Sequence, residues 1–373
     1  MTKRPCGRDS GLRMKLILLC AGVVLPLLTA SLSRAQAIPQ MTGIFSINPG
    51  ASASLSSTST ISPSILAAPY VKGILVRFGW SDIETAEGVY DWSVIDGLLS
   101  QAAASGKQIT LGVMAGYMTP SWVYADGAQP FNFVWDAPTF GPPLCSVQSI
   151  PIPWDPIFLE KWQSFVQAMG ARYSANPTLV SVMLYGVNFR SVETSLPVSI
   201  KQRIPGSRGT RACKGYDYPS LWQSAGYTRT KVENALFAME GYYQSAFPNT
   251  QFLAALNPGG FPPIDENGNL LRRQAVDFQV PKDLMSDGAS TLGEQFAAGN
   301  GALSTNGLTW PLLTEYATAV DTGYQTLSPL GARLPKAIKT AHSMGSRWLQ
   351  LYPSDILLRA NQSALATAFD ELQ

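Results

Sequence analysis

Eight short runs typical of β-strands, alternating with segments of helical periodicity, constrain the fold of this chain more than any other feature. Several of the runs are nearly continuous apolar stretches, as expected for parallel strands buried on both faces. The runs span residues 41–48, 72–80, 108–116, 179–188, 251–258, 294–303, 319–326 and 347–355. Apolar residues recur every three or four positions within 92–102, 158–169, 232–243 and 365–372. Eight strands with intervening helices over about 330 residues predict an α/β fold, a single (β/α)8 TIM-type barrel.

Two long interruptions of this pattern predict where a site would lie. Residues 118–156 follow the third strand and residues 195–219 follow the fourth. In barrel enzymes the loops after the strands form the face that carries the active site. The sequence shows no internal repeat and no second domain, so we expect one barrel with long loops after strands 3 and 4.

The first 37 residues predict a secretory signal peptide. A basic segment ends at Lys15, residues 16–32 are uncharged and apolar, and Ala35-Gln36-Ala37 supplies a small-x-small cleavage site. A membrane anchor is the alternative, but 17 residues interrupted by Pro26 are short for a span of ~20 residues. We therefore expect residues 1–37 to be removed. A barrel domain of residues 38–373 would then be secreted or periplasmic, with no stable membrane span.

Two cysteines remain after such cleavage, Cys145 and Cys213. Each lies in a stretch rich in proline or glycine, which is typical of loops. In an oxidising compartment they are candidates for a disulfide, the alternative being two unrelated thiols.

Charge and histidine content exclude several function classes. The chain has a net charge of +2, but the first 37 residues hold six of its 27 basic residues and one of its 25 acidic ones. The remainder is therefore slightly acidic, which argues against nucleic acid as a partner. The single histidine, His342, excludes a zinc site built from two or three histidines. No phosphate-binding or dinucleotide motif is present, so we expect no cofactor and no metal, and chemistry done by carboxylates.

A motif after the second strand supports a particular kind of barrel. The run Trp80-x-x-Ile83-Glu84-x-x-x-Gly88-x-Tyr90-Asp91-Trp92 resembles the opening of clan A glycoside hydrolases, especially β-galactosidase-like barrels. Those enzymes usually have proline where this chain has Thr85. The similarity is clearest over residues 73–122. It implies a TIM barrel that acts on carbohydrate through two glutamates.

Three residues near this motif are candidates for substrate binding. An arginine within an apolar strand is costly to bury unpaired, so Arg77 is expected to meet a carboxylate or a polar substrate at the barrel mouth. Trp80 and Trp122 could stack on sugar rings or belong to the core. Glu84 and the turn that follows are expected to be structural rather than catalytic.

The fourth strand supplies the candidate acid. In the resembled enzymes an Asn-Glu pair ends this strand, and the glutamate is the acid/base. Here Asn188 is followed by Glu193 only five positions later. Glu193 is the only glutamate near that strand end, so it is the candidate catalytic residue, with a surface carboxylate beside Arg190 as the alternative.

The second carboxylate is missing from its expected place. The resemblance puts a glutamate at the end of strand seven, where this chain has Gln325, and strand eight carries Gln350 and Tyr352. A glutamine can neither form the glycosyl ester nor act as a base for water. These three side chains are therefore candidates for substrate binding. The carboxylates left as possible partners of Glu193 are Asp287, Glu294, Glu315 and Asp355.

The sequence thus predicts an exported glycoside hydrolase that acts on an oligo- or polysaccharide by carboxylate acid/base catalysis. The first alternative is a carbohydrate-binding barrel that has lost its nucleophile. The second is a structural or surface-assembly protein whose apolar loops contact another protein. Saccharide binding without product release separates the first two, and no saccharide binding favours the third.

Overall fold

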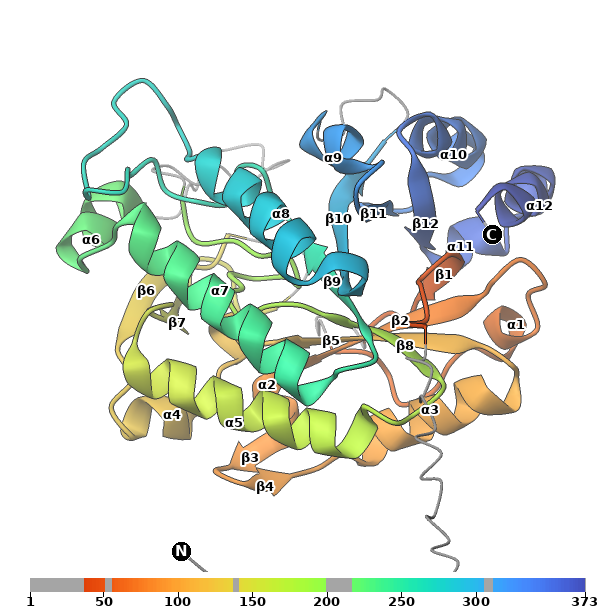
Figure 1. Cartoon of the computed structure of the whole chain (residues 1–373). Coiled ribbons are helices and arrows are strands. Elements are labelled where there is room, and N and C mark those ends of the chain that lie inside the picture. Colours follow the sequence, from red (N-terminus) through yellow and green to blue (C-terminus); the bar gives the residue numbers. More distant parts are fainter. Residues whose placement is uncertain (1–36, 51–55, 137–140, 199–216, 305–310, 373) are drawn as a thin grey trace, which may run out of the picture. The chain divides into compact units, whose positions relative to one another are not determined.

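A closed barrel of eight parallel strands forms the centre of the molecule in the computed structural model, which describes residues 37–50, 56–136, 141–198, 217–304 and 311–372 (Figure 1). The barrel strands are β1 (Gly43–Ile47), β2 (Gly73–Gly79), β5 (Gln108–Met114), β8 (Leu179–Met183), β9 (Gln251–Ala255), β10 (Phe296–Leu303), β11 (Asp321–Thr326) and β12 (Ser346–Leu351). Each of the eight predicted runs contains one of them or overlaps it almost completely. The predicted (β/α)8 barrel is therefore confirmed.

One helix follows each barrel strand and packs outside it. These helices are α1 (Pro63–Leu66), α3 (Ser93–Ala104), α5 (Pro156–Tyr173), α7 (Arg229–Ala246), α8 (Gln279–Thr291), α9 (Pro311–Tyr316), α10 (Leu334–Ser343) and α12 (Gln362–Glu371). In Figure 1, α5, α7 and α8 lie side by side along one flank of the barrel. No helix within the described ranges is long and apolar enough to cross a membrane.

Shorter elements fill the connections. They are the helices α2 (Trp80–Ile83), α4 (Ser121–Ala125), α6 (Tyr218–Ser224) and α11 (Pro353–Ile356) and the hairpins β3 (Glu84–Ala86) with β4 (Val89–Tyr90) and β6 (Pro130–Val134) with β7 (Val147–Pro151). The second hairpin and α4 lie in the long connection after β5. The β3–β4 hairpin turns at Gly88, whose φ of 71° is costly for residues with a side chain.

Side chains of unequal size fill the barrel interior. Trp348 on β12 is 1% exposed, and a Cβ at Gly323 or Gly299 would lie only 2.1 or 2.4 Å from its ring. On the other side, a Cβ at Gly112 would lie 2.7 Å from the sulfur of Met183. Glycines on β5, β10 and β11 thus make room for the large side chains of Trp348 and Met183. The inside of the barrel at this level is therefore a packed core.

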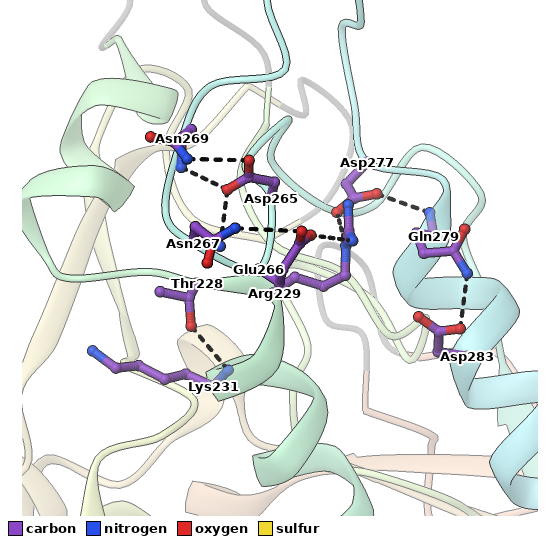
Figure 2. A network of polar contacts seen from close by, with 10 residues as sticks. All are labelled: Thr228, Arg229, Lys231, Asp265, Glu266, Asn267, Asn269, Asp277, Gln279 and Asp283. Atoms are coloured by element: carbon purple, nitrogen blue, oxygen red, sulfur yellow. Dashed lines mark hydrogen bonds and ion pairs between the residues drawn. The ribbon is translucent and has the colours of Figure 1, made fainter.

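A network of charged and polar groups orders the connection after β9 (Figure 2). Arg229, the first residue of α7, donates to Asp277 at 2.7 Å and to Glu266 at 2.8 Å. Asp265 accepts the backbone N–H groups of Asn267 and Asn269 at 2.9 and 2.8 Å. Because Asp277 is only 1% exposed, its charge depends on Arg229. The network therefore ties the middle and the carboxyl-terminal end of this connection to α7.

The predicted cysteine pair is only partly within the described residues. Cys145 is disulfide-bonded and sits in the connection between β6 and β7. Cys213 lies outside the described residues, as does the predicted signal peptide. The pairing of Cys145 with Cys213 and the cleavage after Ala37 remain predictions.

Two carboxyl pairs lie between α7 and α8. Glu240, 1% exposed, accepts a hydrogen bond of 2.5 Å from the Tyr185 hydroxyl and lies beside Asp287. Burial and the neighbouring Asp287 raise its pKa to about 9. Burial and Asp283 similarly raise the pKa of Glu233 to about 8. Both glutamates are therefore protonated in the folded protein at neutral pH.

We expect Glu240→Gln to flatten the pH dependence of stability. The folded protein retains a proton up to about pH 9 that the unfolded chain releases near its ordinary pKa of 4.5, so stability falls as pH rises between these values. Glutamine keeps the shape of the protonated acid and removes this contribution. Melting temperatures from pH 5 to pH 9 measure the effect. The control is Glu160→Gln, which makes the same change at an exposed residue of α5. Parallel curves for wild type and Glu240→Gln would contradict the assignment.

Candidate active site

A cavity of about 240 Å³ opens at the carboxyl ends of the barrel strands. It is smaller than most ligand pockets, which hold roughly 300–1,000 Å³, and suits a single sugar unit. Five of the eight residues predicted for the site line it, namely Arg77, Glu193, Gln325, Gln350 and Tyr352. They come from β2, from the connection after β8, and from β11, β12 and the residue after β12. Residues more than 250 positions apart in the sequence thus meet at one cavity.

Glu193 reaches the cavity because the chain leaves the barrel after β8 and then returns to it. The Leu184 N–H donates to the carbonyl of Leu253 at 2.9 Å, and the next bond of this ladder is made by Thr194, to Ala255 at 2.7 Å. Residues 185–193 therefore form an excursion between two successive ladder positions. Glu193 stands at the spatial end of strand four, which explains the offset of five residues from Asn188.

The close approach of Glu193 to β10 depends on a glycine. The Gly301 N–H bonds the Glu193 carboxyl, and a Cβ at Gly301 would lie 2.6 Å from Glu193 Oε1. The same Cβ would lie 4.0 Å from Nε2 of Gln325. Glu193 Oε1 and Gln325 Nε2 therefore both lie beside Gly301. The distance between these two atoms is below the upper limit for glycosidase carboxyl pairs, which is roughly 9.5 Å.

The surroundings of Glu193 favour its protonated form. Burial raises the pKa of its carboxyl above the ordinary value, while the Gly301 N–H and the charge of Arg190 lower it by smaller amounts. Arg190 is itself paired with Asp136. The side chain of Glu193 is partly accessible from the cavity and enclosed by protein elsewhere. A carboxyl held protonated above the usual range and facing a cavity can serve as a general acid.

The two tryptophans predicted as alternatives for stacking lie outside the cavity. Trp80 is 0% exposed, donates to Glu84 at 2.6 Å, and packs 5.1 Å from the ring of Trp162. Trp122 is half-buried against Trp80 and donates to the Glu84 carbonyl at 3.3 Å. Both rings belong to the core around the β3–β4 hairpin, so neither contacts a ligand in the cavity. This also confirms the structural interpretation of Glu84.

Asn188 is close to Glu193 without lining the cavity. It is 4% exposed, and its Nδ2 donates to the backbone carbonyl of Glu193 at 3.3 Å. An isolated antiparallel bridge pairs it with Thr194. Asn188 therefore closes the base of the excursion and positions Glu193, in place of the predicted contact with substrate.

The remaining side chains of the cavity include several that sequence reasoning missed. Among them are Asn300 and Gly301 at the end of β10, Trp348 on β12, and Leu327 at the rim. Asn300 is fully bonded, because its amide donates to the Leu256 carbonyl and accepts from the Ala302 N–H, both at 2.9 Å. The Gly-Asn-Gly sequence at the end of strand six was the available signal.

Glu193 is the only carboxylate lining the cavity among the described residues. The undescribed segments after residue 37 contain no Asp or Glu. Of the other carboxylates considered, Asp355 is 1% exposed and accepts from the N–H groups of Leu330 and Gly331. Glu294 and Glu315 are exposed away from the cavity, and Asp287 lies on α8 beside Glu240. None of them supplies a second carboxyl opposite Glu193.

Enzymes built on the (β/α)8 barrel keep their active sites at this face of the barrel. The fold is similar to that of the β-amylase catalytic domain from Paenibacillus polymyxa, with 11% identity, a TM-score of 0.55, and coverage of 90% of this chain and 100% of that one. It is also similar to the β-galactosidase from the psychrophilic Marinomonas ef1, with 12% identity and a TM-score of 0.51. That match covers 87% of this chain and 59% of the other. At such identities the likeness concerns the fold.

A sequence match narrows the class. Residues 73–185 match the sequence model of glycoside hydrolase family 42, described as β-galactosidase. No curated protein matches the sequence. The resemblance to β-galactosidase-like glycoside hydrolases is thereby confirmed over β2 to β8, a segment that includes Arg77 and ends before Glu193. The match supports glycosidase activity.

Proposed function

We propose that this chain is a glycoside hydrolase that acts on an oligo- or polysaccharide, with Glu193 as its proton donor. The observation that carries the proposal is the position of Glu193, a carboxyl with a raised pKa at the spatial end of strand four, facing a cavity at the barrel mouth. The match of residues 73–185 to a glycoside hydrolase family model agrees with carboxylate catalysis. So does the histidine content, because the chain has a single histidine, His342.

The reaction follows from the properties of that carboxyl. Glu193 gives its proton to the glycosidic oxygen as the bond between that oxygen and the anomeric carbon breaks. Positive charge develops on the sugar, water adds to the anomeric carbon and releases a proton to the solvent, and Glu193 takes a proton back from the solvent. Gln325 can hold this water by a hydrogen bond but cannot remove its proton. Because one positioned acid or base contributes roughly 10²–10⁴-fold to a rate, we expect turnover below that of a site with two carboxyls.

Release of reducing ends from a panel of plant and bacterial polysaccharides tests the proposal. Binding to the same panel is measured by calorimetry. A saccharide that is both bound and cleaved supports the proposal. The absence of binding to any saccharide would overturn it and favour a structural or assembly role.

A carbohydrate-binding barrel without turnover is the second candidate. It is favoured by one specific observation, that Glu193 is the only carboxylate that lines the cavity among the described residues, while Gln325 at the end of strand seven lines it as well. A saccharide that binds but yields no product, at any enzyme concentration, would favour this candidate over the first.

We further propose that the protein is exported and that the mature chain begins at Ile38. The support is the order of basic segment, apolar run and Ala35-Gln36-Ala37 in the sequence. Amino-terminal sequencing of the protein from the periplasm and the culture medium should therefore start at Ile38. Exported protein that retains residues 1–37 would contradict this expectation and favour an uncleaved anchor.

A further inference from the structure

Arg77 has no partner for its charge within the structure. It lies on β2 and lines the cavity, and its Nε is buried without a hydrogen-bond acceptor. No ion pair joins it to a carboxylate within the described residues. Arg77 is half-buried, and a charge partly removed from water is normally paired, because its lost hydration costs free energy. The conformation of Arg77 therefore fits a site that receives its counter-charge from outside.

The carboxyl of Glu193 does not neutralise Arg77. The charge that acts on this carboxyl is that of Arg190, and burial favours the uncharged form of Glu193. Tyr352, rather than a carboxylate, is the titratable neighbour that acts on Arg77. The undescribed segments after residue 37 contain no acidic residue that could take this place. Arg77 therefore brings to the cavity a positive charge that no described carboxylate is paired with.

A second unpaired donor lines the same cavity. Gln350 on β12 is 2% exposed, and its Nε2 has no hydrogen-bond partner. The cavity thus offers a guanidinium N–H and an amide N–H that both lack acceptors. A carboxylate is the complementary group, because it accepts hydrogen bonds only, carries a negative charge, and binds a guanidinium fork in a fixed geometry.

We propose that the cavity binds an acidic sugar, a uronic acid unit of a glycan, whose carboxylate pairs with Arg77 and accepts from Gln350. This inference rests on the proposed carbohydrate function and names its substrate class. The volume of about 240 Å³ accommodates one such unit. A methyl ester of the same sugar, which has no charge, would leave the guanidinium unpaired.

Matched pairs of ligands test the inference. Trisaccharides of galacturonate, glucuronate and mannuronate, each with its methyl-esterified form, are titrated into the full-length mature protein by calorimetry. At least one acid trisaccharide should bind roughly 10- to 100-fold more tightly than its ester, the cost expected for losing a charged hydrogen-bond partner. The preference should shrink in high salt. Acetate at the same concentration controls for charge without a sugar.

Substitutions of Arg77 test whether this residue causes the preference for the acid over its methyl ester. Arg77→Met should abolish it, Arg77→Lys should retain part of it, and Arg359→Gln, at an exposed arginine outside the cavity, should leave it unchanged. Melting temperature and circular dichroism establish that each variant is folded. If Arg77→Met is unfolded, the inference is still tested by the comparison of acid and ester in the wild type and by the reduced preference expected of Arg77→Lys.

The outcomes separate the two proposals. Equal binding of acids and esters, or a preference that survives in folded Arg77→Met, would overturn the acidic-sugar inference and leave the glycoside hydrolase proposal standing. Binding of neutral saccharides but of no acidic one would likewise overturn the acidic-sugar inference and leave the glycoside hydrolase proposal standing. Binding of acetate as tightly as the trisaccharides would overturn it in favour of a small organic acid. No binding of any saccharide would overturn both proposals.

Discussion

Glu193→Gln is expected to lower the turnover number by roughly 10²–10⁴-fold while leaving saccharide affinity within about threefold of wild type. Glutamine fills nearly the same volume and can keep the hydrogen bond from Gly301, but it has no acidic proton for the leaving oxygen. The loss therefore falls on the chemical step rather than on binding. Reducing-end release gives the turnover number, and calorimetry with the same saccharide gives the affinity.

Glu160→Gln is the matched control, because it makes the same chemical change on an exposed face of α5 and should leave both quantities unchanged. Unchanged turnover in Glu193→Gln would remove this residue from the mechanism. A comparable loss of affinity and turnover would instead assign it to substrate binding.

Gln325→Glu is expected to raise hydrolysis by at least about 100-fold, or to create it where the wild type only binds. The new carboxylate would lie near Glu193 beside Gly301, no farther from it than the roughly 9.5 Å upper limit for glycosidase carboxyl pairs. It could attack the anomeric carbon or take a proton from water. A negative charge there would also raise the pKa of Glu193 further and keep it protonated. Product release by the purified variant, with the anomeric configuration read by NMR, measures the gain.

Gln274→Glu, on the exposed connection after β9, controls for an added negative charge and should have no effect. If folded Gln325→Glu binds saccharide but cleaves it no faster than wild type, the side chain at 325 is not at the position where a second carboxyl acts. The second catalytic group would then have to come from the substrate or from another position in the cavity.

The barrel could be predicted because its signal is local and repeated. Runs such as 72–80 and 251–258 are mostly apolar, which is characteristic of strands covered on both faces. The spacing of Phe158, Trp162, Phe165 and Met169 defines the buried face of α5. Each strand or helix carries this pattern in its own residues. The order of elements then leaves few topologies other than a barrel.

The site could be predicted only in part because its residues are set by tertiary pairing. Glu193 and Asn188 are separated by an excursion whose return to the barrel depends on the bond from Thr194 to Ala255. The role of Gly301 depends on a carboxyl that comes from a different strand connection. Neither relation is visible in a single segment of sequence.

The tryptophans show why residue type alone is ambiguous. Trp80 follows a barrel strand, where an aromatic ring could meet a sugar, yet its indole N–H is satisfied by Glu84 four residues later and its ring packs on α5. The polar atom of a buried tryptophan needs such a partner, and in the structure Glu84 supplies it. Arg77, by contrast, was identified correctly as a cavity residue because a charge within an apolar strand demands a partner.

The protonation state of Glu193 is the most direct test of the account, because it requires no knowledge of the saccharide. With ¹³C-labelled glutamate, the Glu193 carboxyl is assigned by its absence from the spectrum of Glu193→Gln and followed as pH is raised. The account predicts a titration midpoint above the ordinary value of 4.5, since burial outweighs the Gly301 N–H and Arg190. A midpoint at or below 4.5 would mean that the surroundings of Glu193 do not favour its protonated form, and would contradict its assignment as the proton donor.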